Sequence, residues 1–516
     1  MERLPVTSAP VTLGVSGING TLNDYVGLAA TAPGVRFDTS GNSGDVIGPG
    51  SFNNRGNLYL VDGVNITDQV VSIRDVPGAS VEEVKEFQVL TNTYNAEYGQ
   101  AGGVILNVVT KGGTNQIHGD YHYYARGTNF SSSNFFYNAG LTGPVNGQPR
   151  APYFRHEQGI TLGGPLIKDK TFWFVAWEKL AAGVPLQLLP PTGPVATNQP
   201  DSELLLSARL DHQITRNNRL MLRFNQQRIN QDNVLVQIEQ TASPDALVSS
   251  VVHDHTLHGS LVSNLSPFVV NEARMSWHRF FSLTPTKSTL PGLEGPNFYY
   301  HAAFCCPQGA DQNRTEASDT LTWVHGAHTV KGGASLSYFP YFSLFQQVHY
   351  GLWDYGIQQT SDPTTAPSAS GNPPTAFTFA AGPGAVNAKD NIYGWFLQDS
   401  WKIRPSFTMN YGLRWDYEAG AFRGGYINSG SGCLQLNGIV PACSSDKNNF
   451  QPRLGLAWSP QFQSGFMHAL FGDPNKSLIT AGAGEITQLA YLNISLDSLN
   501  FDGVTLLTGG VDPSVP

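Results

Sequence analysis

Residues 406–417 read SFTMNYGLRWDY, and apolar and polar side chains alternate along the whole stretch. The apolar side chains occupy the odd-numbered positions, Phe407, Met409, Tyr411, Leu413, Trp415 and Tyr417. The even-numbered positions carry Ser406, Thr408, Asn410, Gly412, Arg414 and Asp416. Because successive side chains of a β-strand point to opposite faces, this period of two predicts a strand with one apolar and one polar face.

The same alternation recurs from about Gln116 onward, in about thirteen segments of about ten residues each. Three of these segments have apolar side chains at Ile117, Tyr121 and Tyr123, at Ala273, Met275 and Trp277, and at Val330, Leu336 and Tyr338. The polar side chains between them include His118, Asp120 and His122, then Glu272, Arg274, Ser276 and His278, then Lys331, Ser335 and Ser337. Helical spacing is absent from these segments, so most of the chain is predicted to be antiparallel β-sheet.

The connections between the segments alternate between short and long. The short ones are Lys168–Lys170, Arg216–Asn218, His325–Ala327 and Arg404–Ser406. The long ones are Ser131–Arg150, Ala181–Ser202, Ser282–Arg314, Phe342–Asp390 and Ala421–Asn449. Soluble β-sandwiches also alternate apolar and polar residues, but short turns on one rim and long loops on the other are typical of outer-membrane barrels. The prediction is a mainly β protein, an antiparallel transmembrane β-barrel whose outer face contacts outer-membrane lipid.

The number of segments predicts an incomplete barrel. A bacterial single-chain barrel has an even number of strands, about 22 when its lumen holds a plug. We therefore expect about 13 strands of 22 in this chain, with roughly nine C-terminal strands missing. The opening MERLPVTSAP lacks the charged and apolar regions of a secretory signal, and we expect the N-terminus to be truncated as well.

The composition argues against several other classes of protein. Charged residues make up 13% of the 516 residues, while 55 Gly and 11% aromatic residues suit strands and turns better than helices. The net charge is -9 and no Lys/Arg cluster could neutralise a run of phosphates, so no nucleic-acid partner is expected. No stretch approaches the roughly 18 apolar residues of a transmembrane helix, and a polar lumen face explains the mean hydropathy of -0.20.

The N-terminal residues depart from the alternating pattern and predict a small mixed α/β unit. Thr21 is expected to cap a short helix over Leu22–Ala30, and Ser80 has capping-box spacing to Glu83 before a second short helix. Strands are predicted over residues 57–61, 87–90 and 104–110. The pattern changes at Gly112-Gly113, so we expect one domain over residues 1–112 and a second over residues 113–516.

Several motifs of this unit together resemble the plug of TonB-dependent receptors. They are NLYLVDGV at 57–64, VKEFQV at 84–89, YNAEYG at 94–99 and GGVILNVVTK at 102–111. YGWFLQDSW at 393–401, LRWDY at 413–417 and NFQPRLGLA at 449–457 are similar to barrel strands of the same family, closest to its Oar-like branch. The similarity covers nearly the whole chain, and the order and spacing of the motifs make the set specific.

The resemblance implies a receptor in the outer membrane of a Gram-negative bacterium. In that family the plug blocks the barrel until an energised TonB-type protein of the inner membrane pulls on an N-terminal segment, the TonB box, which this sequence lacks. The plug-motif residues carried over from the family are Asp62, Gly63, Glu97, Tyr98, Gly99, Gly102, Gly103 and Lys111. The glycines allow close backbone approach or a positive φ where the plug turns toward the wall, although ordinary turn glycines are an equal alternative.

Two hypotheses of function follow. The first is active uptake of a scarce, bulky solute, such as a metal chelate, an oligosaccharide or a peptide. The alternative is a non-transporting surface barrel that displays loops for adhesion or assists export. A soluble carbohydrate-binding propeller would show repeats of about 40 residues, which are absent. The sequence has no G-x-S-x-G, Walker A or H-E-x-x-H motif, so neither an enzyme nor a cofactor is expected.

Two histidine clusters are weighed as metal sites. His118, Asp120 and His122 share one strand face, while His253, Asp254, His255 and His258 form a second cluster. Imidazole and carboxylate suit transition ions. A polar lumen face carries such residues anyway, however, and a period of two places His258 opposite His253 and His255. No metal site is therefore predicted.

The long loops hold aromatic groups and all four cysteines. Phe135, Phe136 and Tyr137, and also Phe298, Tyr299 and Tyr300, either stack on a ligand or anchor the rim. Counting strands places Cys433 and Cys443 in one extracellular loop, where the oxidising surroundings predict a disulfide between them. The adjacent Cys305 and Cys306 could form only a strained ring or bond elsewhere, and their state stays open.

Overall fold

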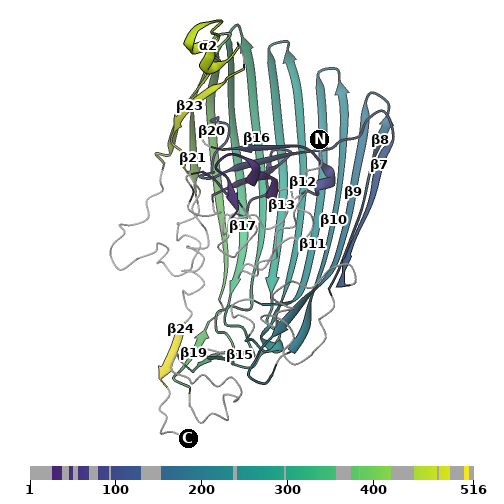
Figure 1. Ribbon diagram of the computed structural model, residues 1–516, viewed down its shortest axis with the longest axis vertical. Helices are drawn as coiled ribbons and strands as arrows, with labels where there is room; N and C mark the ends of the chain where they lie inside the picture. Colours follow the sequence, from purple (N-terminus) through teal and green to yellow (C-terminus); the bar gives the residue numbers. More distant parts are fainter. Residues whose placement is uncertain are drawn as a thin grey trace.

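A computed structural model describes residues 26–37, 46–49, 51, 56–68, 79–91, 95–128, 153–193, 195–235, 241–295, 298–355, 374–382, 384–419, 447–473, 476–487 and 505–510. Its main element is a 13-stranded antiparallel sheet, which we call the wall (Figure 1). The wall confirms the predicted fold class and strand number. Its strands, in spatial order, are β7 (His118–Gly127), β8 (Phe154–Ile167), β9 (Thr171–Leu188), β10 (Val195–Thr215), β11 (Asn218–Val234), β12 (Val248–Ser266), β13 (Val269–Thr284), β16 (Gln308–His325), β17 (His328–Phe345), β20 (Ala385–Arg404), β21 (Phe407–Glu418), β22 (Phe450–Trp458) and β23 (Ile479–Gly484).

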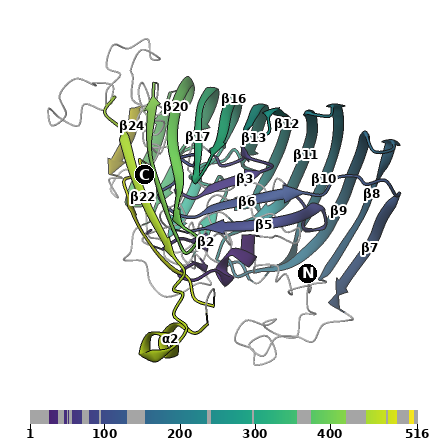
Figure 2. The same cartoon turned by 90° about the horizontal axis from the view of Figure 1, so that it is seen from above.

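The wall is curved but not closed, and a small N-terminal sheet lies in its hollow (Figure 2). This small sheet has the order β4-β3-β6-β5, with β3 and β6 parallel and the other neighbours antiparallel. Its strands are β3 (Leu58–Val61), β4 (Val64–Asn65), β5 (Val84–Leu90) and β6 (Ile105–Thr110). Shorter elements complete the N-terminal unit: η1 (Val26–Thr31), β1 (Arg36–Phe37), β2 (Val46–Ile47) and η2 (Val81–Glu83). β7 pairs with β8 and not with this unit, as expected from the pattern change at Gly112-Gly113.

The N-terminal unit has a hydrophobic core of its own. Tyr59, Val104, Leu106 and Val108 are buried there together with Val26 of η1. The predicted capping box is present, because the Ser80 side chain accepts from the Glu83 amide while the Glu83 carboxylate accepts from the Ser80 amide. The helix it starts ends after one turn, so β5 begins at residue 84, three residues before the predicted strand. η1 covers only the end of the helix predicted over residues 22–30, since residues 22–25 lie outside the described part of the chain.

The polar face of the wall points toward the N-terminal unit and the apolar face points outward, as the alternation predicts. On β21, Arg414 and Asp416 are buried, whereas Tyr411 is among the exposed large hydrophobic residues. On β13, Ser276 and His278 are buried, whereas Met275 is 63% exposed. A one-residue change of register would exchange the two faces, so the strand pairing fixes which side chains meet the N-terminal unit.

The connections confirm the short turns and correct three of the long loops. The four predicted short connections join β8 to β9, β10 to β11, β16 to β17 and β20 to β21. Residues 181–202, predicted as a loop, are mostly strand, because β9 runs to Leu188 and β10 starts at Val195. Parts of residues 282–314 and 342–390 form strands of a second sheet, which satisfies backbone groups that a plain loop would leave unpaired. In spatial order this loop sheet is β15 (Phe298–Tyr300), β14 (Gly292–Gly295), β18 (Leu352–Asp354), β19 (Ala376–Ala381) and β24 (Thr505–Gly510).

The remaining two long connections, 131–150 and 421–449, lie outside the described residues apart from positions 447–449. The loop sheet and the short turns lie at opposite ends of the wall, and α2 (Gly465–Phe471) lies at the short-turn end (Figure 1). Among the helices of the described residues, none has the length and apolar character needed to cross a membrane.

Candidate functional site between the N-terminal unit and the wall

The turn between β3 and β4 places Asp62 against the wall. Asp62 and Gly63 both have positive φ, 50° and 80°, the conformation that favours Asp-Gly in a two-residue hairpin turn. The Asp62 carboxylate accepts from the Thr110 amide at 2.9 Å and from the Thr110 hydroxyl at 2.7 Å. It also faces two wall guanidinium groups, Arg209 at 3.4 Å and Arg223 at 3.6 Å. The predicted residue Asp62 is therefore a charged contact between the two parts.

The end of β6 is bound by the same arginine. Arg209 donates to the carbonyl and to the hydroxyl of Thr110, both at 3.0 Å, and its Nε donates to Asp211 at 2.8 Å. Directly after this strand the chain runs against the wall backbone, because a Cβ built on Gly113 would lie 2.3 Å from the Trp173 carbonyl oxygen. Only glycine fits there without a backbone shift.

A second contact is made by the YNAEYG motif. Glu97 pairs with Lys331, and its amide donates to the Gln398 side chain at 3.0 Å. Arg414, held by Asp416 at 2.7 Å, donates to the Glu97 carbonyl at 3.2 Å. Three neighbouring wall strands, β17, β20 and β21, therefore hold the backbone and the side chain of Glu97 at once.

Tyr98 and Gly99 complete this contact. Burial, together with the neighbouring Glu97 carboxylate, raises the pKa of the Tyr98 hydroxyl. A Cβ built on Gly99 would lie 2.0 Å from Arg414 Nε, so the absent side chain is what admits the guanidinium. Close approach, one of the two alternatives for these glycines, therefore applies to Gly99. Near the start of the motif, Arg453 donates to the Asn95 carbonyl at 2.9 Å.

A third contact lies after β4. Arg314 of β16 donates to the carbonyls of Asn65 and Thr67, the latter at 3.3 Å. The neighbouring Gln312 donates to the Asp68 carboxylate at 2.8 Å. Both wall residues are buried, so these bonds are shielded from solvent.

The remaining predicted plug-motif residues contact the N-terminal unit itself or are exposed. Lys111 donates to the Glu82 carbonyl at 2.5 Å, inside the N-terminal unit. Gly103 is buried against Asn57, and Gly102 is exposed. The contact between η2 and the wall is made by Glu83, whose carboxylate accepts from Arg223 at 3.3 Å. Glu83 is not among the predicted plug-motif residues.

A cavity of about 330 Å³ lies between the small sheet and the wall. Its lining includes Asp62, Gly63, Glu97, Tyr98, Gly99, Glu272, Arg274, Glu316 and Arg414. The Arg274 guanidinium pairs with Glu272 at 2.7 Å. Ligand pockets are mostly apolar, so this charged lining suits a separable polar interface better than a small-molecule pocket.

The barrel motifs LRWDY and NFQPRLGLA contain two of the wall residues that hold the N-terminal unit, Arg414 and Arg453, but do not single them out, and the other charged ones lie outside the motifs. The charged ones are Arg209, Arg223, Arg314, Lys331, Arg414 and Arg453. Alternation could place each of them on the polar face of its strand, but it does not indicate which inward-facing residues have a partner across the lumen.

The second histidine cluster is divided between the two faces of its strand, as the period of two predicts. Asp254 and His258 are buried on the inner face, while His253 and His255 are on the other. Asp254 pairs with His278 of the next strand, so the second cluster does not converge on one point. In the first cluster His122 is buried, whereas His118 and Asp120 are exposed.

Of the cysteines and aromatic residues singled out in the long loops, only some lie within the described residues. Cys433, Cys443 and residues 135–137 lie outside the described residues. Cys305 and Cys306 are buried free thiols whose sulfur atoms are 2.7 Å apart. The rings of Phe298 and Tyr299 are buried in the loop sheet, and the Tyr299 hydroxyl donates to the Ala302 carbonyl at 2.9 Å. These two rings therefore stabilise the loop sheet and are not presented to a ligand.

Comparison with known proteins matches the wall to a family. A family model described as the outer membrane beta barrel domain matches residues 109–198 and 192–484. The TonB-dependent transporter Oar of Myxococcus xanthus is 32% identical over 161 residues, which are 31% of this chain and 14% of Oar.

Solved structures share the fold at low sequence identity. The outer membrane transporter YddB of Escherichia coli superposes with a TM-score of 0.65 at 11% identity, over 94% of this chain and 61% of YddB. A mutant of the ferric enterobactin receptor PfeA of Pseudomonas aeruginosa gives 0.54 at 14% identity, over 84% of this chain and 57% of the receptor. The chain thus spans less than two thirds of the length of each of these relatives.

Proposed function

We propose, because this chain belongs to the outer membrane β-barrel family, that it is a plug-gated receptor which imports a bulky, scarce solute with energy from a TonB-type protein. It is a protein of the Gram-negative outer membrane and not an enzyme. Residues 1–112 act as the plug and residues 113–516 as part of the barrel.

The observation that carries the proposal is the kind of contact between the N-terminal unit and the wall. The contacts described above are hydrogen bonds and ion pairs, and the larger hydrophobic core lies wholly within the unit; only a smaller cluster, around Leu58, Leu60 and Ile105, also packs against Ile486, which follows β23. A neutral hydrogen bond contributes about 0.5 to 1.5 kcal/mol net, and one to a charged group about 1.5 to 3 kcal/mol. Such bonds can be broken one after another by a mechanical pull, so the unit could leave the lumen without first losing its core.

The class of solute is suggested by relatives. Oar is named a TonB-dependent transporter and PfeA a ferric enterobactin receptor. A metal chelate is therefore the first solute class to test, followed by an oligosaccharide and a peptide. The solute site would lie on the loop side of the plug, where a ligand meets the protein before the gate.

Gating is tested with the full-length protein in planar bilayers. The intact protein should show little KCl conductance, and a variant without residues 1–112 should form a steady open channel. Heat-modifiable mobility on SDS gels checks that the variant's barrel has folded. A folded variant that conducts no better than the intact protein would contradict the assignment of residues 1–112 as the plug.

Uptake is tested in cells that lack the gene. These cells should grow poorly on one of three nutrient sources. The three sources are iron supplied as a chelate, carbon supplied as an oligosaccharide and nitrogen supplied as a peptide. Deletion of the TonB-type protein should produce the same defect. Normal growth on all three classes, with loss of surface attachment or of a secreted product, would support the adhesion or export alternative.

A further inference from the structure

Three neighbouring wall strands bring His122, Gly159 and Glu178 into one line. His122 of β7 is paired with Gly159 of β8, which is paired with Glu178 of β9. The side chains of a cross-strand row point to the same face, and here that face is the lumen. A Cβ on Gly159 would lie 2.7 Å from both His122 Nε2 and Glu178 Cγ. The missing side chain therefore lets the imidazole and the carboxylate approach each other.

Glu157 joins this pair from the same face of β8. One ligand atom each of His122, Glu157 and Glu178 lie within 4.8 Å of one another. The three residues are 9%, 2% and 3% exposed, so the group is closed off from bulk solvent. Arg155 pairs with Glu157 at 2.7 Å, whereas no ion pair with a basic residue is found for Glu178 within the described part of the chain.

Two atoms of the group are left without a hydrogen bond. His122 Nδ1 and Glu178 Oε1 are buried and have no partner among the described residues. Buried polar atoms nearly always have one, because an unsatisfied buried donor or acceptor costs about 1 to 3 kcal/mol. A buried imidazole and a buried carboxylate that each keep an open position, in a group whose ligand atoms lie within 4.8 Å of one another, are able to accept a cation.

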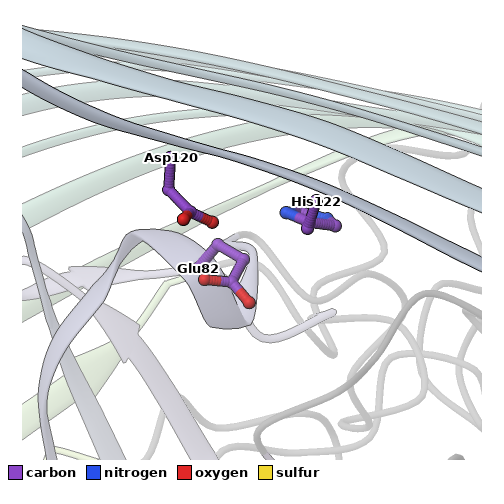
Figure 3. Close-up of side chains that lie close together, drawn as sticks. All are labelled: Glu82, Asp120 and His122. Atoms are coloured by element: carbon purple, nitrogen blue, oxygen red, sulfur yellow. The ribbon is translucent and has the colours of Figure 1, made fainter.

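The N-terminal unit adds a carboxylate to the same histidine. Glu82 and Asp120 also have ligand atoms within 4.8 Å of each other and of His122. Figure 3 shows Glu82 on the N-terminal unit and Asp120 beside His122 on the adjacent strand. Glu82 lies in η2, which the Ser80 capping box holds in place. This second set shares only His122 with the first, so Glu82 places a carboxylate of the plug beside the site without being one of its three ligands.

We propose that His122, Glu157 and Glu178 bind a divalent first-row transition ion, with Glu82 of the plug beside the same histidine. One imidazole with several carboxylates suits ions such as Zn²⁺, Co²⁺ and Mn²⁺, whereas an all-oxygen set would favour Mg²⁺ or Ca²⁺. The bound ion links β7, β8 and β9 at the edge of the wall, next to η2 of the N-terminal unit. This proposal does not depend on import, since the three ligands belong to the wall of a transporting or a non-transporting barrel alike.

The test uses the full-length protein, stripped of metal with a chelator and dialysed. Titration with Co²⁺ should give a d–d absorption band that saturates at one ion per chain, and Zn²⁺ should abolish the band by competition. His122→Ala and Glu178→Gln should each weaken Zn²⁺ binding at least tenfold in calorimetry. Glu82→Gln should weaken it by a smaller factor and should increase hydrogen exchange in residues 81–84 of the zinc-loaded protein.

The matched control is His118→Ala, because His118 lies on the same strand but is exposed and outside the cluster. This variant should bind Zn²⁺ as the parent does. Heat-modifiable mobility on SDS gels establishes that each variant is folded, and Glu178→Gln keeps the shape of the side chain. Absence of saturable binding by the parent protein, or equal affinity of the parent and His122→Ala, would overturn the site. Unchanged affinity in Glu82→Gln would remove the plug's part in it.

Discussion

The Gly99 Cα faces the guanidinium of Arg414 so closely that a Cβ on Gly99 would lie 2.0 Å from Nε. Arg414 cannot easily move away, because Asp416 holds two of its nitrogens at 2.7 Å. The glycine and the arginine belong to different parts of the fold, so their fit measures how tightly the N-terminal unit is seated against the wall.

Gly99→Ala should therefore weaken the contact between the N-terminal unit and the wall. Overpacking of a close contact costs about 1 to 3 kcal/mol, and here the cost falls on the interface between two parts. Hydrogen exchange of residues 95–100 in the full-length protein should become faster, while that of β6 stays unchanged. Gly102→Ala is the control, since Gly102 is exposed. Equal exchange rates in the two variants would contradict the close fit.

Arg209→Ala should weaken the contact at Asp62 more severely. The substitution leaves Asp62 and Asp211 without one of their positive partners, and breaking a buried ion pair costs about 3 to 5 kcal/mol. Urea denaturation, followed by hydrogen exchange of residues 105–111, should show a lower midpoint for the N-terminal unit. Arg219→Ala serves as the control, because Arg219 is 57% exposed and an exposed pair is worth about 0 to 1 kcal/mol. Equal denaturation midpoints for the two variants would show that Arg209 does not hold the N-terminal unit against the wall.

Leu413→Arg should destabilise the barrel, whereas Asn410→Arg should have a small effect. Leu413 is on the outward, odd-numbered face of β21, where it is paired with Leu397, which is 56% exposed. A charged residue facing lipid costs about 2 to 4 kcal/mol near the bilayer midplane. Refolding of the full-length protein into lipid vesicles across a denaturant titration measures the difference. Similar losses for both variants would mean that the two faces have been assigned wrongly.

Cys433 and Cys443 should form a disulfide in the full-length protein, although both lie outside the described residues. Closing a loop of about eleven residues would stabilise by about 3 kcal/mol in the chain-entropy model, less any strain. Non-reducing peptide mapping of protein from outer membranes should recover the linked pair. Free, alkylatable thiols at both positions would show that the loop or its compartment is wrong.

Acid should loosen the loop sheet near Asp245. Burial acts to raise the pKa of this carboxyl, but hydrogen bonds from Ser243 and His301, the latter at 2.6 Å, prevail and lower it. Because its pKa is lowered in the folded state, the ionised Asp245 carboxyl stabilises the fold at pH values above the usual pKa of 3.8. This stabilisation is lost as the pH falls through the lowered pKa. Hydrogen exchange of residues 298–303, corrected for its intrinsic pH dependence, should lose protection in the parent as the pH falls below 3.8. Asp245→Asn should lack this loss, and an equal loss in the variant would exclude Asp245 as its source.

Much of this protein is determined by local sequence. The alternation at residues 406–417 specifies β21 and its two faces, since a strand repeats every two residues whatever its neighbours are. The turn at Asp62-Gly63 and the capping box at Ser80 and Glu83 are equally local, because both are closed by residues at most three positions apart. These features predict a β-barrel with a small N-terminal unit.

The tertiary structure alone decides which inward-facing residues meet. Asp62 and Arg209 are 147 positions apart in the chain, and His122 and Glu178 come together only through the pairing of three strands. The loop sheet between β13 and β20 likewise depends on partners from distant loops. Periodicity assigns a side chain to a face, but the partner across the lumen depends on strand register and on how the N-terminal unit docks. Both are set by contacts between distant parts of the chain, which no local pattern encodes.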